Sequence, residues 1–404
     1  MHALIYSTAS FLLLYFIHHL PVNQLFIDPF SEAIKGQDLM DVALSKFRNK
    51  KDAKLFEQRL LIINSGITDR TKIANTISYL NRHEAKVIGL DLLVDTFYKT
   101  PADTLLQTAI HNSNQIVFGY TFLEGNKRHS SSKLLESNSF FTQGKLEGYV
   151  NLGTNDRFSV RTFEPFHPIH EKIEKSFGLQ IASYYDPLIL ADLEKRNLET
   201  EWINYRRVQP GKSSMIYPIN RDGLQHYEML SIDNFLQDTS LFPLTFFTNK
   251  IVLIGFCGEN ENALSMKDRY FTPLNEQYTG RSIPDMHGVI IHANIISMLL
   301  DRDFICEVSH TKVYIYTILL FIFNFFLYSE LEHKNYFRSI PFIRIIQIIE
   351  FFIFLALCLV LLISFNIKLG FIFIITSIIM SYEFFEIYEA KLKLRVEKIL
   401  GISV

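Results

Sequence analysis

Long apolar runs occupy both ends of the chain and predict membrane-spanning helices. The first, Ala3 to Leu20, contains no Asp, Glu, Lys or Arg, and it nearly reaches the roughly 20 residues with which a helix crosses about 30 Å of hydrocarbon. Three further runs follow near the C-terminus: Val313 to Ser329, Ile345 to Ile367 and Leu369 to about Phe385. The pattern therefore predicts an α-helical membrane part of four spanning helices, one N-terminal and three C-terminal.

Two of these runs have an alternative interpretation. A cleavable signal peptide would also be apolar, but the first run has no basic segment before it and no small-x-small motif after it, which favours an uncleaved anchor. In the last run, Glu383 and Glu386 shorten the apolar stretch. A re-entrant or interfacial helix therefore stays open there.

Basic residues beside the apolar runs predict the orientation, because Lys and Arg in short loops are retained on the cytoplasmic side. With four spans, both termini are then cytoplasmic and residues of about 21 to 310 lie outside. In a bacterium with two membranes, this arrangement is that of a multi-pass protein of the inner (cytoplasmic) membrane with a large domain in the periplasm. The basic residues are Lys334, Arg338 and Arg344 between the second and third runs, and Lys391, Lys393, Arg395 and Lys398 after the fourth.

A single acidic residue, Glu350, interrupts the third run. A carboxylate at membrane depth is costly unless it is protonated, paired or turned into the helix bundle. Because Glu350 lies about one and a half turns from Arg344, we expect it to snorkel or form an ion pair toward that basic end. A proton or ion pathway would need more polar partners.

The middle of the chain alternates short apolar runs with helical patterns. Four runs rich in β-branched residues are typical of strands buried on both faces, and between the first two, Thr71 to Glu84 places apolar residues at helical spacing. The pattern predicts an α/β fold with a mixed, mostly parallel sheet covered by helices. The expected strands are Leu60 to Gly66, Lys86 to Val94, Gln115 to Phe122 and Lys250 to Gly258.

An antiparallel addition is expected beside this sheet. Gly148 to Gly153 and Ser159 to Phe166 are typical of a hairpin around the turn Thr154-Asn155-Asp156, and Trp202 to Arg207 opens another short strand. No repeat or linker divides the segment, so we expect one domain. The expected organisation is an anchor at 1–24, an extracytoplasmic domain at 25–308, a three-helix membrane region at 309–390 and a cytoplasmic tail at 391–404.

Composition and charge exclude several function classes. The formal net charge is −2 and no Lys or Arg cluster is apparent, which gives no basis for a nucleic-acid partner. Three widely spaced cysteines do not form a disulfide framework or a zinc motif. No nucleophile elbow, zinc-protease motif, phosphate-binding loop or kinase signature occurs. We therefore expect no enzyme activity, no metal and no cofactor.

Two groups of polar residues are candidates for ligand binding. Asp91 and Asp95 follow a buried strand, at the carboxyl edge where α/β sheets bind ligands; they could hold a cation or polar ligand, or Asp91 could cap the backbone. The second group could bind an anion at a helix N-terminus, or Asp268 and His292 could fix the Thr-Pro loop to the following helix. This group consists of Asp268, Thr272, His292 and Asn294.

Several motifs together resemble the CHASE2 domain, an extracytoplasmic sensory domain of bacterial transmembrane receptors. These are KIVLIGFCGENE at 250–261, Asp268 before Phe271-Thr272-Pro273, and HGVIIHANIISMLL at 287–300, with AKVIGLDLLV, GYVNLG and the Ser159-Val160-Arg161 segment upstream. The resemblance covers about residues 25 to 305 and implies one helix before the domain and three after it. It adds Arg161 to the candidate ligand-binding residues.

The chain departs from this family in two respects. CHASE2 receptors usually continue into a kinase or cyclase, whereas about 15 residues follow the last apolar run here, and the first strand offers Asn64 and Asp69 in place of the usual acidic pair. The expected function is a sensory or protein-interaction module in signal transduction that acts through a partner protein. Its other contacts would be the bilayer or a second copy. The alternative is a structural scaffold subunit of a bacterial envelope-spanning complex.

Overall fold

The chain divides into two compact units in the computed structural model, one formed by residues 35–304 and the other by residues 1–34 and 305–404. The turn expected at 154–156, the basic residues Lys334 and Arg338, and the expected boundary near residue 24 lie outside the described residues. The structure describes residues 1–19, 39–47, 56–123, 133–152, 159–170, 172–208, 225–243, 245–259, 265–275, 283–333 and 340–400.

The unit of residues 35–304 is built on one mostly parallel sheet with the strand order β10-β11-β1-β12-β2-β3-β4, and β5 pairs with β3. All of these pairings are parallel except that of β3 with β4. The predicted α/β fold is therefore confirmed. The strands are β1 (Phe56–Asn64), β2 (Val87–Asp91), β3 (Ile116–Leu123), β4 (Lys133–Leu135), β5 (Leu146–Tyr149), β10 (Arg207–Val208), β11 (Gln225–Ser231) and β12 (Ile251–Gly255).

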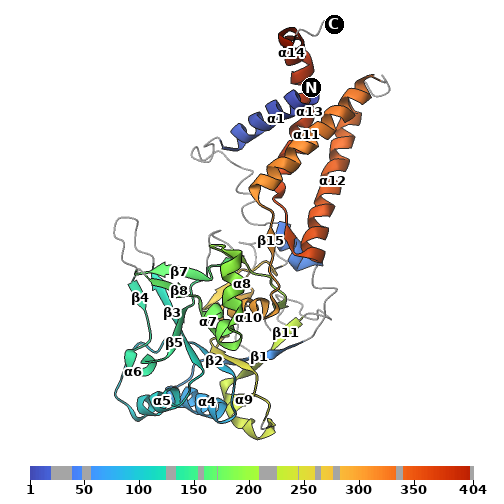
Figure 1. Cartoon of the computed structure of the whole chain (residues 1–404). Coiled ribbons are helices and arrows are strands. Elements are labelled where there is room, and N and C mark those ends of the chain that lie inside the picture. The colour runs from blue at the N-terminus through green and yellow to red at the C-terminus, as the bar shows by residue number, and fades with distance from the viewer. Residues whose placement is uncertain are drawn as a thin grey trace. The chain divides into compact units, whose positions relative to one another are not determined.

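Helices cover both faces of this sheet, as Figure 1 shows. On one face, α4, α5 and α9 share a core with alternate residues of the central strands, such as Leu61, Ile88 and Val252. On the other face lie α7 and α10. The helices of the unit are α3 (Leu39–Val42), α4 (Arg70–Arg82), α5 (Pro101–His111), α6 (Ser139–Thr142), α7 (Phe177–Tyr185), α8 (Leu188–Arg196), α9 (Ile232–Gln237) and α10 (Gly288–Asp301).

Local sequence explains where these elements begin and how closely they pack. Asp69 caps α4 by accepting a hydrogen bond from the Lys72 amide, and Thr100 forms a reciprocal capping box with Asp103 at the start of α5. Helix α7 approaches β2 at Gly89, where a Cβ atom would lie 2.5 Å from Ile181 Cδ1. Glycine at this position therefore lets the buried side chains of Ile181 and Leu253 pack directly over the strand, and a larger residue would displace them.

The expected hairpin is wrong. Instead of pairing with the following segment, β5 joins the main sheet parallel to β3, and β6 (Thr162–Phe163) pairs antiparallel with β9 (Glu201–Trp202). The short strand expected at Trp202 is present in β9, and β10 follows it as a separate strand. Two more antiparallel pairs complete the unit: β7 (Phe166–Ile169) with β8 (Lys172–Lys175), and β13 (Arg269–Tyr270) with β14 (Met286–His287).

The other unit is mainly helical, and a helix forms at each of the four apolar runs. Among the described residues, two helices are long and apolar enough to cross a membrane, at His310–Glu332 and Phe342–Phe365; the apolar stretch His2–Phe16 is shorter. The elements are α1 (His2–His19), β15 (Cys306–Glu307), α11 (His310–His333), α12 (Ile340–Phe365), β16 (Ile367–Lys368), α13 (Phe371–Ile387) and α14 (Lys393–Leu400).

Polar contacts near the ends of α12 and α13 differ from the expectation for Glu350. Arg344 pairs with Glu383 of α13 at 2.5 Å and bonds to Gln347 at 2.9 Å. Glu350 faces Asn324 of α11 instead, with 3.5 Å between Asn324 Nδ2 and Glu350 Oε2. Arg344, at the basic end of α12, therefore pairs with Glu383 of α13 rather than with Glu350 of its own helix. Residue spacing along one helix could not predict this contact between two helices.

Candidate functional site

The carboxyl ends of three neighbouring strands form one row of the sheet. Asn64 of β1 is in register with Gly255 of β12, and Gly255 is in register with Asp91 of β2. Ligands of open parallel sheets bind outside the carboxyl ends of the strands. Ligand-binding side chains are therefore expected at this row of strand ends.

Asp91 presents a carboxylate with no hydrogen-bond partner among the described residues. The residue is half-buried, and it lies so close to two glycines that a Cβ atom on Gly255 would be 3.2 Å from Asp91 Cβ and one on Gly119 would be 3.5 Å from Asp91 Oδ1. Desolvation, and then the negative charge of Asp268, raise the pKa of Asp91 to about 7. The site therefore favours either a proton or an added cation.

Asp268 is the second carboxylate of this edge. It comes before β13 in the chain, and its side chain lies beside Gly288, the first residue of α10. Its backbone oxygen accepts a hydrogen bond from the Gly288 amide at 3.1 Å, and a Cβ atom on Gly288 would lie 3.2 Å from both carboxylate oxygens. Although the residue as a whole is exposed, burial of its carboxylate raises the pKa to about 6, against a hydrogen bond from Tyr270. Its φ of 55° lies in the left-handed region, which Asp adopts more readily than most residues with a side chain.

Asn64 braces the loops around the two carboxylates. Its Nδ2 donates to the Gly258 oxygen at 3.1 Å, and its Oδ1 accepts from the amides of Gly66 at 3.0 Å and Cys257 at 2.8 Å. Burial raises the pKa of the Cys257 thiol well above its ordinary value, so this cysteine is not a nucleophile. Asn64 therefore fixes the loops at the carboxyl edge of the sheet. Asp69 is the N-cap of α4 and does not belong to this site.

Of the seven candidate residues, the structure brings Asp91 and Asp268 together. Asp95 is exposed and accepts a hydrogen bond from its neighbour Thr96. Arg161 forms a buried ion pair with Asp41, with Nη2 2.7 Å from Oδ2 and Nε 3.0 Å from Oδ1. Asp95 and Arg161 therefore do not join Asp91 and Asp268 in the site at the sheet edge.

The remaining three candidates stabilise the fold around α10. Thr272 donates its amide to Asp285 Oδ1 at 2.8 Å and its hydroxyl to Oδ2 at 2.5 Å. The ring of His292 packs edge-on against Phe177, and burial lowers its pKa to about 4, so it is neutral. Asn294 accepts from the Arg206 amide and donates to the Ile290 oxygen. Asp41 and Asp285, the partners of Arg161 and Thr272, lacked a sequence motif that could have revealed them.

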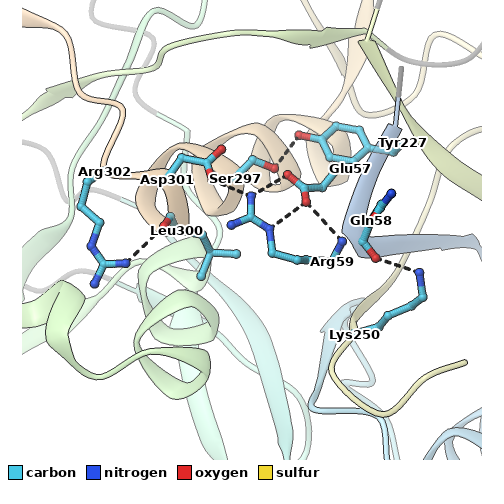
Figure 2. Close-up of polar contacts among 9 residues, drawn as sticks. All are labelled: Glu57, Gln58, Arg59, Tyr227, Lys250, Ser297, Leu300, Asp301 and Arg302. Atoms are coloured by element: carbon cyan, nitrogen blue, oxygen red, sulfur yellow. Dashed lines mark hydrogen bonds and ion pairs between the residues drawn. The ribbon is translucent and has the colours of Figure 1, made fainter. Parts of the chain in front are cut away.

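The far end of α10 is held by ion pairs, part of which Figure 2 shows. Arg59 of β1 lies between two carboxylates: its Nη2 is 2.7 Å from Asp301 Oδ1, and its Nε is 2.8 Å from Oε1 of the buried Glu57. One turn earlier on α10, Ser297 meets the Tyr227 hydroxyl of β11 at 3.1 Å. The last two turns of α10 are thus fixed to the first part of two sheet strands.

The next two residues of the chain extend this clamp. Arg302 pairs with Asp186 at 2.7 Å and with Asp192 at 3.0 Å, which belong to the end of α7 and to α8. Asp303 pairs with Arg206 at 2.5 Å. Three consecutive charged residues after the body of α10 are therefore bound to three different parts of the domain.

The fold is thus an α/β domain with two neighbouring carboxylates at the carboxyl edge of a mostly parallel sheet, followed in the chain by two helices apolar enough to cross a membrane. The family model of the CHASE2 domain matches residues 51–327. Because this match covers more than half of the chain, the protein belongs to the CHASE2 family. Membership suggests an extracytoplasmic sensory module. No curated protein and no solved structure matches the chain.

Proposed function

We propose that this protein is a membrane-anchored sensory module of the bacterial inner membrane whose CHASE2 domain lies in the periplasm. In this proposal four helices span the bilayer, the first within residues 1–24 and the others within 309–390, and both termini are cytoplasmic. The module senses rather than catalyses, and it acts through a partner protein or a second copy of itself. Family membership and the two long apolar helices support this placement.

The observation that carries the proposal is the unsatisfied carboxylate of Asp91 beside Asp268 at the sheet edge. A half-buried carboxylate without a donor is costly in the ionised state. A bound cation would remove that cost by pairing with both carboxylates, so a cationic ligand, either a metal ion or an organic amine, fits the site. A cation that binds only the folded state stabilises it in proportion to the logarithm of its concentration.

Helix α10 supplies a route from this site to the opposite side of the same domain. Its first residue, Gly288, contacts Asp268, and its last, Asp301, is held by Arg59. All residues from Gly288 to Leu300 are buried, and the helix is roughly 21 Å long at 1.5 Å per residue. A ligand that binds two arrangements of this helix with different affinity would shift the population between them.

The binding half of the proposal is tested on the full chain in lipid nanodiscs. Ca²⁺, Mg²⁺ and spermidine are titrated separately while thermal unfolding is followed by the fluorescence of Trp202, the single tryptophan. We expect at least one cation to raise the unfolding temperature of the wild type and of D95N, and to have no effect on D91N. No change with any of the three cations, or an equal change in D91N, would exclude this edge as the cation site.

The placement and the partner are tested separately. Periplasm-dependent reporter fusions after residues near 150 should be active, and fusions at the C-terminus should be inactive. Stoichiometric co-purification of several envelope proteins, without any ligand-dependent change in the chain, would favour the scaffold function over the sensory one.

A further inference from the structure

Two polar side chains meet between the two longest apolar helices. Asn324 of α11 is fully buried, and its Nδ2 lies 3.5 Å from Oε2 of Glu350 on α12. The other oxygens of the pair, Asn324 Oδ1 and Glu350 Oε1, are buried and have no hydrogen-bond partner among the described residues. A polar group in this situation carries a desolvation cost unless a partner satisfies it.

The two side chains lie at matching depths. Glu350 is eight residues from Phe342 at one end of its apolar helix, and Asn324 is eight residues from Glu332 at the end of the other. At 1.5 Å per residue, each is roughly 12 Å from that end, well inside a hydrocarbon layer of about 30 Å. If the helices span the bilayer, neither side chain reaches water without distorting its helix.

No cation is available to compensate an ionised Glu350 among the described neighbours. On its own helix, Arg344 is paired with Glu383 of α13. The hydroxyl groups of Tyr328 on α11 and Tyr6 on α1 both bond to Ser381 of α13.

The groove beside Glu350 is almost entirely apolar. It measures about 940 Å³ and lies between α11, α12 and α13. Lys312 also lines it, but it is 12 residues from Asn324 along α11, which corresponds to roughly 18 Å. Glu350 is half-buried and lines this groove, so a hydrophobic reagent in the groove can approach its side chain, whereas Lys312 lies several helical turns away along the groove.

We propose that Glu350 is a membrane-embedded proton-binding site, in which the neutral carboxylic acid donates its proton to Asn324 Oδ1 while Asn324 Nδ2 donates to Glu350 Oε2. A carboxylic acid and a primary amide are complementary in this way, because each has one donor and one acceptor on the facing edge. The single added proton satisfies both of the orphaned oxygens. Loss of this proton would leave two acceptors opposed and would separate α11 from α12.

This inference rests on the proposed membrane placement of α11 and α12, and it adds a ligand, the proton, that the sheet-edge site does not involve. Because α11 begins a few residues after the domain, protonation of Glu350 would bias the packing of the first helix that follows it. The proton that binds Glu350 would come from the compartment to which the groove opens, so the pH of that compartment would set how much of the protein is protonated.

The test uses the full chain in nanodiscs and the hydrophobic reagent dicyclohexylcarbodiimide, which attacks protonated carboxyl groups within bilayers. The acid proton moves to a nitrogen of the reagent, the carboxylate oxygen adds to its central carbon, and the acyl group then shifts to nitrogen as a stable adduct. Near neutral pH, mass spectrometry should find this adduct on Glu350 in the wild type and lose it in E350Q. E350Q keeps the paired geometry, since glutamine presents the same donor and acceptor as the neutral acid, so it is the matched control for folding.

Infrared difference spectra of the same samples provide the second readout. The wild type should show the carbonyl band of a protonated carboxylic acid that disappears in E350Q, and N324L should shift this band to higher wavenumber because the hydrogen bond is lost. If the chain resists alkaline carbonate washing yet shows neither the adduct nor the acid band, the proton site is excluded and the membrane placement stands. An acid band that N324L leaves unshifted excludes the pairing. Release of the chain by carbonate excludes both the placement and this inference.

Discussion

Replacement of Asp91 by asparagine should make the protein more stable at alkaline pH. The pKa of Asp91 is raised from 3.8 to about 7 in the folded protein, first by desolvation and then by Asp268. The folded state therefore holds the proton more tightly than the unfolded chain does. Stability is highest below the unfolded pKa and falls as the pH rises through about 7. Asparagine resembles the neutral acid and removes this loss.

The size of the effect follows from the shift. One pKa unit corresponds to about 1.4 kcal/mol, and a rise from 3.8 to about 7 implies that the wild type loses about 2.5 kcal/mol between pH 5 and pH 8 through this group. Asp91 is only half-buried, so water partly screens its negative charge and lowers the free-energy cost of ionising it. We therefore expect a loss of unfolding free energy of about 1 to 2.5 kcal/mol between pH 5 and pH 8. D91N should show a correspondingly flatter stability profile over the same range.

Urea unfolding of the full chain in nanodiscs, followed by Trp202 fluorescence, measures this profile at each pH. D95N is the matched control, because Asp95 is exposed and its side chain accepts a hydrogen bond from its neighbour Thr96; its profile should follow the wild type. The reasoning is refuted if D91N and the wild type lose stability in parallel between pH 5 and pH 8. It is also refuted if D95N flattens the profile as much as D91N does.

Three further predictions use the same fluorescence assay. R161M should lower the unfolding free energy by about 3 to 5 kcal/mol, because it removes the arginine that pairs with the buried carboxylate of Asp41. A loss that D41L in the same chain does not partly restore would contradict this. G89A should cost about 1 to 3 kcal/mol, because the new methyl group would lie 2.5 Å from Ile181 Cδ1 in a packed interior. An unchanged stability would show that the Ile181 side chain or α7 can move away. N64L should lower the unfolding free energy by at least about 2 kcal/mol, because three hydrogen bonds to the loops are lost, and it should weaken any stabilisation by cations at Asp91. Unchanged stability and cation binding would show that Asn64 does not fix the loops of this site.

The sequence predicted the central strands well because their burial is complete and local. Runs such as Leu60 to Ile63 are inaccessible on both faces, and the central strands of a parallel sheet covered by helices require that pattern. The hairpin failed for the opposite reason. Strand β5 pairs with β3, more than 20 residues earlier in the chain, and a pattern of apolar residues does not specify which distant strand is its neighbour.

The candidate site was predictable in part. Asp91 follows a buried strand, and the carboxyl-edge rule places it where ligands bind; Asp268 belonged to the polar group expected near a helix N-terminus. The ion pair of Arg161 with Asp41 joins residues 120 positions apart, and the contact of Asn324 with Glu350 joins two helices. Such contacts depend on tertiary packing, so no spacing rule along one element could identify them.

Complete enclosure of α10 has a mechanical consequence for the domain. A helix with solvent on one side can tilt by small degrees, but every residue from Gly288 to Leu300 is surrounded by packed side chains. Tilting would open voids, and close-packed interiors resist voids. Displacement of α10 therefore requires its neighbours to repack together, and packed interiors pass between discrete arrangements rather than deforming continuously. A ligand that moves α10, as proposed above, is therefore expected to act with a threshold rather than in a graded way.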